Sequence, residues 1–327
     1  MTAHDEEIAF LRARPEHEAE ILDLLAAALA WEEGPSGQEL HRWKHRENPF
    51  GASAEWVAVA GGRVVGYRAF QRWELDRGGT RIPVARAVDA ATRPEYRGRG
   101  VFTNLTLRAL DALRADGIEF VFSTPNSQSR PGHLKMGWQV VGRLPVSARV
   151  RSLPRLARMI TTRGDDRATS RSVEAMRAPQ ALAETTSVRE LLSRLPKDSR
   201  LHTPRSVEYL QWRYRPDSLG YHAVTAGDGV SDGLAVFRTR HRGSMVAASI
   251  CELLVPAATP DATGTLLRAV RKTRGIDDVL RLSGTDVRRG FIRLPGRGPV
   301  LTWRGVRAVD MPDVRRWNLE FGDVELF

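Results

Sequence analysis

The stretch Thr92–Leu110, "TRPEYRGRGVFTNLTLRAL", places arginines and glycines immediately before a segment with the apolar spacing of a helix. Gly98 and Gly100 can adopt backbone conformations that are closed to other residues, so the main chain can approach a ligand closely. The first N–H groups of the following helix have no partner inside it and, with the helix dipole, form an anion site. Arg97 and Arg99 add positive charge. The stretch therefore predicts a site for a phosphate group.

Two other phosphate-binding patterns do not fit this stretch. No Gly-Lys-Ser/Thr follows the glycines, as a nucleotide P-loop requires. Thr103 stands where the third glycine of a dinucleotide-binding fingerprint would be. The site is thus expected to hold its phosphate group in another way.

The segments around this stretch alternate between strand-like and helix-like patterns. Their expected order is strand, two helices, three strands, helix, strand, short helix and strand. The ranges are 7–13, 14–33, 37–51, 54–62, 63–76, 80–93, 101–116, 118–126, 129–138 and 139–151. This order predicts a mixed sheet flanked by helices, an α/β fold that begins antiparallel and ends in a βαβ unit.

Two segments together resemble GNAT-type N-acetyltransferases. "PEYRGRGVF" (94–102) resembles the Arg/Gln-x-x-Gly-x-Gly/Ala loop that binds acyl-CoA in that family, with a strand before it and a helix after it. Phe102 occupies the place of the final Gly/Ala, and we expect its side chain to pack inward. "PNSQSRPGHLKMGW" (125–138) resembles the family's later segment, in which Lys135 and Gly137 match the motif and Trp138 replaces a phenylalanine. His133 stands where the family commonly has a tyrosine general acid.

The resemblance implies a binding site for acetyl-CoA or another short acyl-CoA, with no metal. Strand backbone would pair with the pantetheine amides, an asparagine would orient the pantetheine chain, and the loop would hold the pyrophosphate. The residues expected to do so are Ala90, Ala91, Thr92, Arg97, Gly98, Arg99, Gly100, Val101, Phe102, Thr103 and Asn126.

Three residues are candidates for the chemistry that the resemblance implies. His133 would donate a proton to the departing thiolate if its pKa stays high enough; otherwise it is structural and ordered water serves. Asp89, the only carboxylate in its strand, would take a proton from the acceptor amine if burial raises its pKa; otherwise it is a structural aspartate near Arg86 or Arg93. Glu33 is a candidate for binding the acceptor.

A second copy of the pattern occurs later in the chain. Residues 209–239 can be laid over residues 40–70, so that Trp212 falls on Trp43 at an offset of 212 − 43 = 169. Both tryptophans are expected in the core. The later copy has "ATPDATG" in place of the Arg97–Gly100 loop. We therefore expect two GNAT-like lobes from duplication, with one binding site; chance similarity of short amphipathic stretches is the alternative. The expected domains are 1–150, a helical linker at 151–199, and a degenerate lobe at 200–327.

The composition of the chain argues against several other functions and locations. The 327 residues carry a net charge of +11, but lysine occurs only at four positions (44, 135, 197, 272), so 50 − 4 = 46 basic residues are arginine and they are scattered. This distribution disfavours a nucleic-acid partner. No apolar run is long enough to span a membrane, and the acidic start lacks the order of a signal peptide. Cys251 is the single cysteine, which is typical of a cytoplasmic protein.

These observations favour an acyl-CoA-dependent N-acyltransferase that acts directly on a primary amine of a small molecule or peptide, as a monomer or homodimer. Two alternatives remain. A Fem-like aminoacyltransferase would use two such lobes with aminoacyl-tRNA, which the positive charge suits and the intact loop does not. A CoA-binding sensor without catalysis would account for His133 and Phe102 in place of the usual residues.

Overall fold

The computed structural model describes residues 6–29, 35–149, 173–242 and 245–324, and the chain divides into two compact units. The first unit takes its described residues from 1–75, 80–142 and 301–313, and the second takes them from 76–79, 143–300 and 314–327. Each unit is built on one seven-stranded mixed sheet. The α/β class with two mixed sheets that the sequence predicts is confirmed.

The first sheet follows the predicted order of elements. Its strands lie in the order β1-β2-β3-β4-β5-β14-β6. The elements are β1 (Ala9–Arg12), α1 (Glu18–Leu29), α2 (Pro35–His45), β2 (Ala54–Ala60), β3 (Arg63–Arg77), β4 (Thr80–Thr92), α3 (Val101–Ala115), β5 (Phe120–Ser123), α4 (Arg130–Lys135), β6 (Gln139–Arg143) and β14 (Val300–Gly305).

Strands β4 and β5 are parallel for only part of their length. Their register runs from Val84 opposite Phe120 to Arg86 opposite Phe122. β5 ends at Ser123, whereas β4 continues to Thr92. Among the described residues, the β5-side edge of β4 beyond Arg86 therefore has no strand partner, and its backbone groups are available to a ligand.

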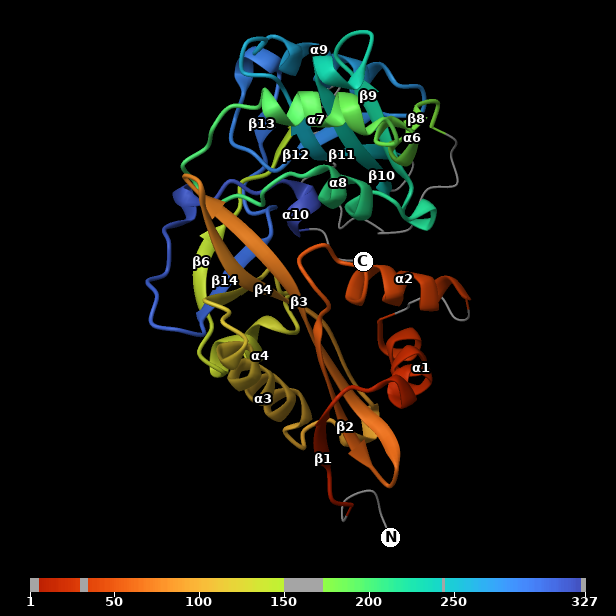
Figure 1. Cartoon of the computed structure of the whole chain (residues 1–327), viewed down its shortest axis with the longest axis vertical. Helices are drawn as coiled ribbons and strands as arrows, with labels where there is room; N and C mark the ends of the chain where they lie inside the picture. The colour runs from red at the N-terminus through yellow and green to blue at the C-terminus, as the bar shows by residue number, and fades with distance from the viewer. Residues whose placement is uncertain (1–5, 30–34, 150–172, 243–244, 325–327) are drawn as a thin grey trace. The chain divides into compact units, whose positions relative to one another are not determined.

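The two faces of the first sheet carry different helices. Figure 1 shows α1 and α2 on one face and α3 and α4 on the other. A Cβ built on Gly66 of β3 would lie 2.4 Å from Cγ1 of Val101, the first residue of α3. The neighbouring Tyr67 points to the other face, where its hydroxyl meets His41 of α2. The glycine thus lets the start of α3 lie directly on the sheet.

The second sheet has the strand order β13-β7-β12-β11-β10-β9-β8. Its run from α8 to β12 repeats the order of elements from α2 to β5, including a parallel final pair, β11 with β12. The elements are β7 (Ser147–Arg149), β8 (Met176–Arg177), α6 (Ala178–Ala181), α7 (Thr185–Ser193), α8 (Val207–Arg213), β9 (Tyr221–Thr225), β10 (Leu234–Arg242), β11 (Met245–Leu254), α9 (Ala262–Lys272), β12 (Asp278–Arg281), β13 (Ile292–Arg293) and α10 (Phe321–Val324).

The closing strand expected over 139–151 is divided in the structure. Its first part is β6 in the first sheet, and its described second part is β7 in the second sheet. Pro145 lies between them and cannot donate to a strand ladder, which explains the break. The late strand β14 in turn pairs with β5 in the first sheet, from Thr302 opposite Ser123 to Gly305 opposite Phe120.

Strands β4 and β11 share an irregularity. In β11, Val236 pairs with Glu252 and Phe237 with Ile250, so Cys251 is a bulge. In β4, Ala87 belongs to the core cluster on the α3 face, but Asp89, two residues on, bonds to α2 on the other face. Alternation would put both residues on one face, so it is interrupted at the residue between them, Val88.

Candidate functional site

The Arg97–Gly100 loop has the backbone that an anion site needs. Gly98 and Gly100 have φ angles of +79° and +75°. The first helical hydrogen bond of α3 runs from the Asn104 N–H to the Gly100 carbonyl at 2.9 Å. The N–H groups of residues 101–103 precede it and have no acceptor in the described parts of the chain. A Cβ on Gly98 would meet nothing within 4 Å, so a ligand can come close there.

The two loop arginines differ in what they already contact. The Arg97 side chain is exposed, and no described residue forms a hydrogen bond or ion pair with it, whereas its backbone N–H donates to the Pro94 carbonyl at 3.2 Å. Arg99 donates to the Glu6 carbonyl at 2.8 Å and lies 5.1 Å from the ring centre of Tyr96. The Tyr96 hydroxyl itself donates to the Glu6 carboxylate at 2.6 Å. Arg99 therefore helps to hold the loop, and Arg97 is the arginine available to an anion.

The remaining expected CoA contacts lie around the unpaired edge of β4 and the turn after β5. Ala90 and Thr92 are partly exposed, and Ala91 is buried. The Oδ1 atom of Asn126 accepts from the backbone N–H groups of Gln128 and Ser129 at 3.0 and 2.9 Å. Asn126 thus shapes the turn that leads into α4.

His133 lies buried between α3 and the sheet. Its Nδ1 is 3.1 Å from the Ser129 carbonyl oxygen, and its Nε2 is 3.3 Å from a guanidinium nitrogen of Arg68. A carbonyl only accepts, so Nδ1 carries the proton and Nε2 accepts from Arg68. Phe102 packs inward as expected, with its ring centre 5.6 Å from that of His133.

The pKa of His133 differs from the sequence expectation. Burial and the neighbouring Arg68 cation lower it to about 4, against the hydrogen bond to the Ser129 carbonyl. His133 is therefore neutral near pH 7. The lowered pKa favours the structural alternative for His133 over the general acid, which would need a higher pKa.

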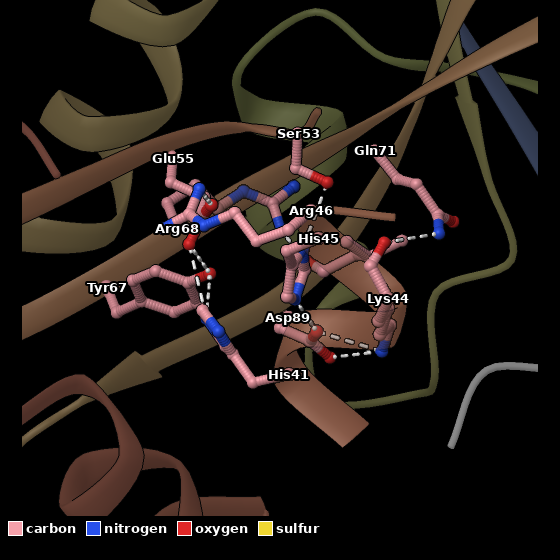
Figure 2. A network of polar contacts seen from close by, with 11 residues as sticks. His41, Lys44, His45, Arg46, Ser53, Glu55, Tyr67, Arg68, Gln71 and Asp89 are labelled. Carbon is pink, nitrogen blue, oxygen red and sulfur yellow. Dashed lines mark hydrogen bonds and ion pairs between the residues drawn. The ribbon is translucent and has the colours of Figure 1, made fainter. Parts of the chain in front are cut away.

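Asp89 forms a buried cluster with α2, shown in Figure 2. Lys44 Nζ lies 2.9 and 2.8 Å from its two carboxylate oxygens, and His45 Nε2 lies 3.0 Å from one of them. His45 Nδ1 is in turn 3.0 Å from the Ser53 hydroxyl. The partners of Asp89 are thus Lys44 and His45, not the arginines near it in sequence.

This cluster favours the structural alternative for Asp89 over the raised pKa that a catalytic base would need. Burial alone would raise that pKa, but the Lys44 ammonium and the His45 hydrogen bond outweigh it and hold the pKa well below the usual range. The pKa of His45 is lowered in turn by burial, despite its bond to Asp89. Asp89 is therefore an ion-paired carboxylate that binds a proton only in strong acid.

A second carboxylate extends the cluster beside α2. Glu55 lies 3.2 Å from His41 Nε2, accepts from the Tyr67 hydroxyl at 2.8 Å, and also contacts Arg46. None of these residues was singled out from the sequence. The signal that was available is the spacing of His41, Lys44 and His45, which places all three on one face of a helix.

The second unit contains a carboxylate in the same place. Glu252 lies three residues after Ser249, the last residue of β11 that pairs with β12, just as Asp89 lies three residues after Arg86. Arg205 lies 2.8 Å from Glu252 and also contacts Asp323 at 3.0 Å. A buried carboxylate paired with a cation therefore follows the irregularity of the strand in both units.

Arg68 of β3 is a further residue that the sequence reasoning missed. It is 2% exposed and donates to the Val88 carbonyl and to His133. Its guanidinium carbon lies 4.6 Å from the ring centre of Phe70 and 5.3 Å from that of Phe102. Its Nε atom is buried with no hydrogen-bond partner. Arg68 is distinguished only by contacts with residues that are distant in the sequence, so local sequence patterns could not identify it.

The other sequence expectations are placed as follows. Glu33 lies outside the described residues, as does the part of the expected linker from residue 151 to residue 172. Trp43 and Trp212 are buried in their respective units. Within the described ranges, no group of three or more His, Cys, Asp or Glu side chains is placed to hold a metal ion. No described helix is both long enough and apolar enough to cross a membrane.

Comparisons with known proteins agree with this geometry. Residues 10–141 match the sequence model of the acetyltransferase (GNAT) domain. The match covers 141 − 10 + 1 = 132 of the 327 residues, and we refer to this GNAT-like segment as the GNAT domain. It contains α3, the Arg97–Gly100 loop and the unpaired edge of β4, so the GNAT resemblance of the sequence is confirmed. GNAT domains in general transfer an acyl group from an acyl-CoA co-substrate.

Solved structures extend the likeness beyond this GNAT domain. A conserved protein of unknown function from Enterococcus faecalis is similar over 92% of this chain and 73% of its own, with 13% identity and a TM-score of 0.67. GCN5-related N-acetyltransferases from Anabaena variabilis and Kribbella flavida give TM-scores of 0.62 and 0.61 at 16% and 18% identity. They cover 92% and 93% of this chain and 73% and 72% of theirs. No curated protein sequence matches the chain. The likeness shows that the fold of both units is shared.

Proposed function

We propose that this chain is an N-acyltransferase that uses acetyl-CoA or another short acyl-CoA and acylates a primary amine of a small molecule or peptide directly. One observation carries the proposal. The helix start with unpaired N–H groups, the available Arg97 and the unpaired edge of β4 belong to the same GNAT domain. The first two parts suit an anionic pyrophosphate, and the third suits an extended chain that contains amides.

The residues present fit coenzyme A. The N–H groups of residues 101–103 and the Arg97 side chain would hold the pyrophosphate, because oriented N–H groups and the helix dipole favour a doubly charged group. The backbone of Ala90, Ala91 and Thr92 would pair with the pantetheine amides. Asn126 would orient the pantetheine chain from the turn before α4. The thioester supplies an activated acyl group, and the protein positions it for attack.

The proposal assigns one CoA site to the chain. α9 corresponds to α3 in the order of elements, but its N-cap residue is Asp261. A carboxylate at a helix start repels a phosphate group. The preceding segment, Pro256–Pro260, contains no glycine. The second unit is therefore proposed to hold no nucleotide.

The geometry supports a revised assignment of the two catalytic candidates. Asp89 has a counterpart in Glu252, in the unit without the loop, so its ion pair accompanies the fold and not the CoA site. We propose a structural role for Asp89, with the acceptor amine losing its proton to water. His133 is neutral and hydrogen-bonded through both ring nitrogens, which supports a positioning role. The buried Cys251 lies in the second unit, and no covalent enzyme intermediate is proposed.

Calorimetry with CoA and a thiol-release assay with acetyl-CoA and a panel of amines test the function. We expect CoA binding and faster thiol release when a suitable amine is present. Tight CoA binding with no turnover over the whole panel would support a sensor instead. Salt-sensitive binding of tRNA without CoA binding would support an aminoacyl-tRNA donor. The cytoplasmic location and the monomeric or homodimeric state stay predictions, the latter checked by light scattering.

A further inference from the structure

Arg68 is a buried cation with no directly bonded anion among the described residues, although the Asp89 carboxylate, itself paired with Lys44, acts on its charge from a greater distance. Its hydrogen bonds go to two neutral acceptors, the Val88 carbonyl and His133 Nε2. No described carboxylate forms an ion pair with it, and its Nε–H has no acceptor. A guanidinium has five N–H donors, so several remain for a further partner. Buried charges in proteins are normally paired because an unpaired one is costly, so this arrangement indicates an anion that binds or forms there.

The contacts of Arg68 come from two sides of the proposed CoA site. Phe102 follows the Arg97–Gly100 loop at the start of α3. Val88 lies in β4 just beyond Arg86, where pairing with β5 has ended. The guanidinium is therefore held beside the unpaired edge of β4, next to the helix that carries the loop. A pantetheine chain paired with this edge would bring its sulfur end to the same region.

Comparison of the two units separates Arg68 from the features that belong to the fold. The segment Gly66–Phe70, "GYRAF", aligns with Gly233–Phe237, "GLAVF", at an offset of 237 − 70 = 167, two residues less than the offset that aligns Trp43 with Trp212. This offset is chosen because the final phenylalanines both lie in the core, against α3 and α9 respectively. In this alignment Ala235, fully buried among apolar residues, stands in the place of Arg68. The paired carboxylate occurs in both units, whereas Arg68 and the loop occur only in the GNAT domain.

We propose that Arg68 is a catalytic residue that stabilises negative charge on the sulfur of CoA when the thioester bond breaks. This inference rests on the proposed acyl-CoA function. The amine nitrogen bonds to the acyl carbon, the carbon–sulfur bond breaks, and its electron pair stays on sulfur as the CoA thiolate. The amine proton passes to water. Arg68 donates a hydrogen bond to the thiolate and does not transfer a proton.

The charge state of Arg68 and its hydrogen bond to His133 both suit this role. Burial lowers the pKa of Arg68 to about 10, while the charge of Asp89 opposes the shift, so the side chain remains a cation near neutral pH. His133 accepts from it through Nε2 and keeps the guanidinium in place, which makes His133 a positioning residue. A charge-assisted hydrogen bond of this kind is strongest where water is excluded.

The pKa of the thiol in enzyme-bound CoA tests the proposal without knowledge of the acceptor. It is measured on the full chain from the ultraviolet absorbance of the thiolate as pH is raised. A cation in contact lowers such a pKa by about 1–3 units, so we expect that shift on binding to the wild type. Arg68→Met should remove the shift, and Arg68→Lys should retain part of it. Arg72→Met is the matched control, because Arg72 lies on the same strand and has Asp116 as its partner.

The outcomes distinguish a failure of the role proposed for Arg68 from a failure of the proposed function. Failure of the wild type to bind CoA would overturn both. CoA binding with an unshifted thiol pKa in the wild type would overturn the role of Arg68 alone, even if Arg68→Met does not fold. Equal shifts in the wild type and a folded Arg68→Met variant would do the same. With an acceptor in hand, Arg68→Met should lower kcat by about 10²–10³ with KM for acyl-CoA nearly unchanged.

Discussion

Asp89 of β4 and Glu252 of β11 occupy the same place in their two sheets. Each lies three residues beyond the last pair that its strand forms with a parallel neighbour, Arg86 with Phe122 and Ser249 with Leu280. Each follows an irregularity in its strand and is paired with a cation. The second unit has this buried ion pair but lacks the Arg97–Gly100 loop, so the pair is explained by the fold. Removing the carboxylate should therefore lower the free energy of unfolding before it affects activity.

Asp89→Asn should destabilise the first unit. The variant leaves the Lys44 ammonium buried beside a neutral amide, and breaking a buried pair in this way costs about 3–5 kcal/mol. Denaturant or thermal unfolding measures the effect, and kcat per folded molecule should change little. Removing both partners with Asp89→Leu and Lys44→Met should cost less than Asp89→Asn alone. A stable Asp89→Asn variant that loses kcat would restore Asp89 as a catalytic base.

The two loop arginines should contribute unequally to CoA affinity. Arg97→Ala removes the arginine that no described residue pairs with, and the loss of a charge-assisted contact should raise Kd about tenfold or more. Arg99→Ala should have a smaller effect on binding at matched folding, because Arg99 already bonds to the Glu6 carbonyl. Calorimetry measures both. Arg114→Ala, an exposed arginine at the other end of α3, is the control. Equal losses for Arg97 and Arg99 would contradict the distinction.

Gly66→Ala should disturb the CoA loop through the start of α3, which packs on Gly66 of β3. The added Cβ would lie 2.4 Å from Val101 Cγ1, so the start of the helix must move or the side chains must rearrange. Overpacking of this kind costs about 1–3 kcal/mol, and we expect a lower Tm together with weaker CoA binding. Gly229→Ala in the second unit is the control, since its Cβ would approach only the Ser231 hydroxyl at 4.0 Å. CoA affinity that stays at the wild-type level in Gly66→Ala would show that the loop does not depend on this contact.

The parts that local sequence patterns predicted are those set by neighbours along the chain. Gly98 and Gly100 identify a positive-φ turn, and the apolar spacing after them identifies α3, because both depend on adjacent residues. The order of elements through β6 follows in the same way. Pro145 was visible in the sequence as a strand breaker, yet the assignment of β6 and β7 to different sheets depends on partners far along the chain.

The parts that escaped prediction depend on contacts between distant residues. Lys44 meets Asp89 across 45 residues, and Arg68 meets His133 across 65. These contacts invert the expected pKa directions, because a lone buried carboxylate and a paired one shift in opposite ways. Strand β14, which begins at residue 300, pairs with β5 in the first sheet. No local sequence pattern predicts this pairing. The sequence pointed to the strand of Asp89 and the helix of His133. The protonation states of these two residues depend on tertiary partners that are distant in the sequence.

The lowered pKa of His133 predicts an acid-dependent loss of stability. The ordinary pKa of histidine, 6.5, applies to the unfolded chain, and the folded value is about 4. Between these values the unfolded chain binds more protons, so the free energy of unfolding falls as pH is lowered from about 6.5 to 4. The shift corresponds to about 3 kcal/mol, reached in full below pH 4. Urea unfolding over this pH range measures the slope.

His133→Gln isolates this contribution, because glutamine can donate and accept hydrogen bonds without titrating. The slope between about pH 6.5 and 4 should become smaller but not vanish, since the pKa of the buried His45 is also lowered. Asp89 acts in a separate window: its folded pKa is depressed, so its stabilisation persists above its ordinary value of 3.8 and is lost only below it. An unchanged slope in His133→Gln would mean that the pKa of His133 in the folded chain is not lowered, contrary to burial beside the Arg68 cation, and the positioning role of His133 would fail.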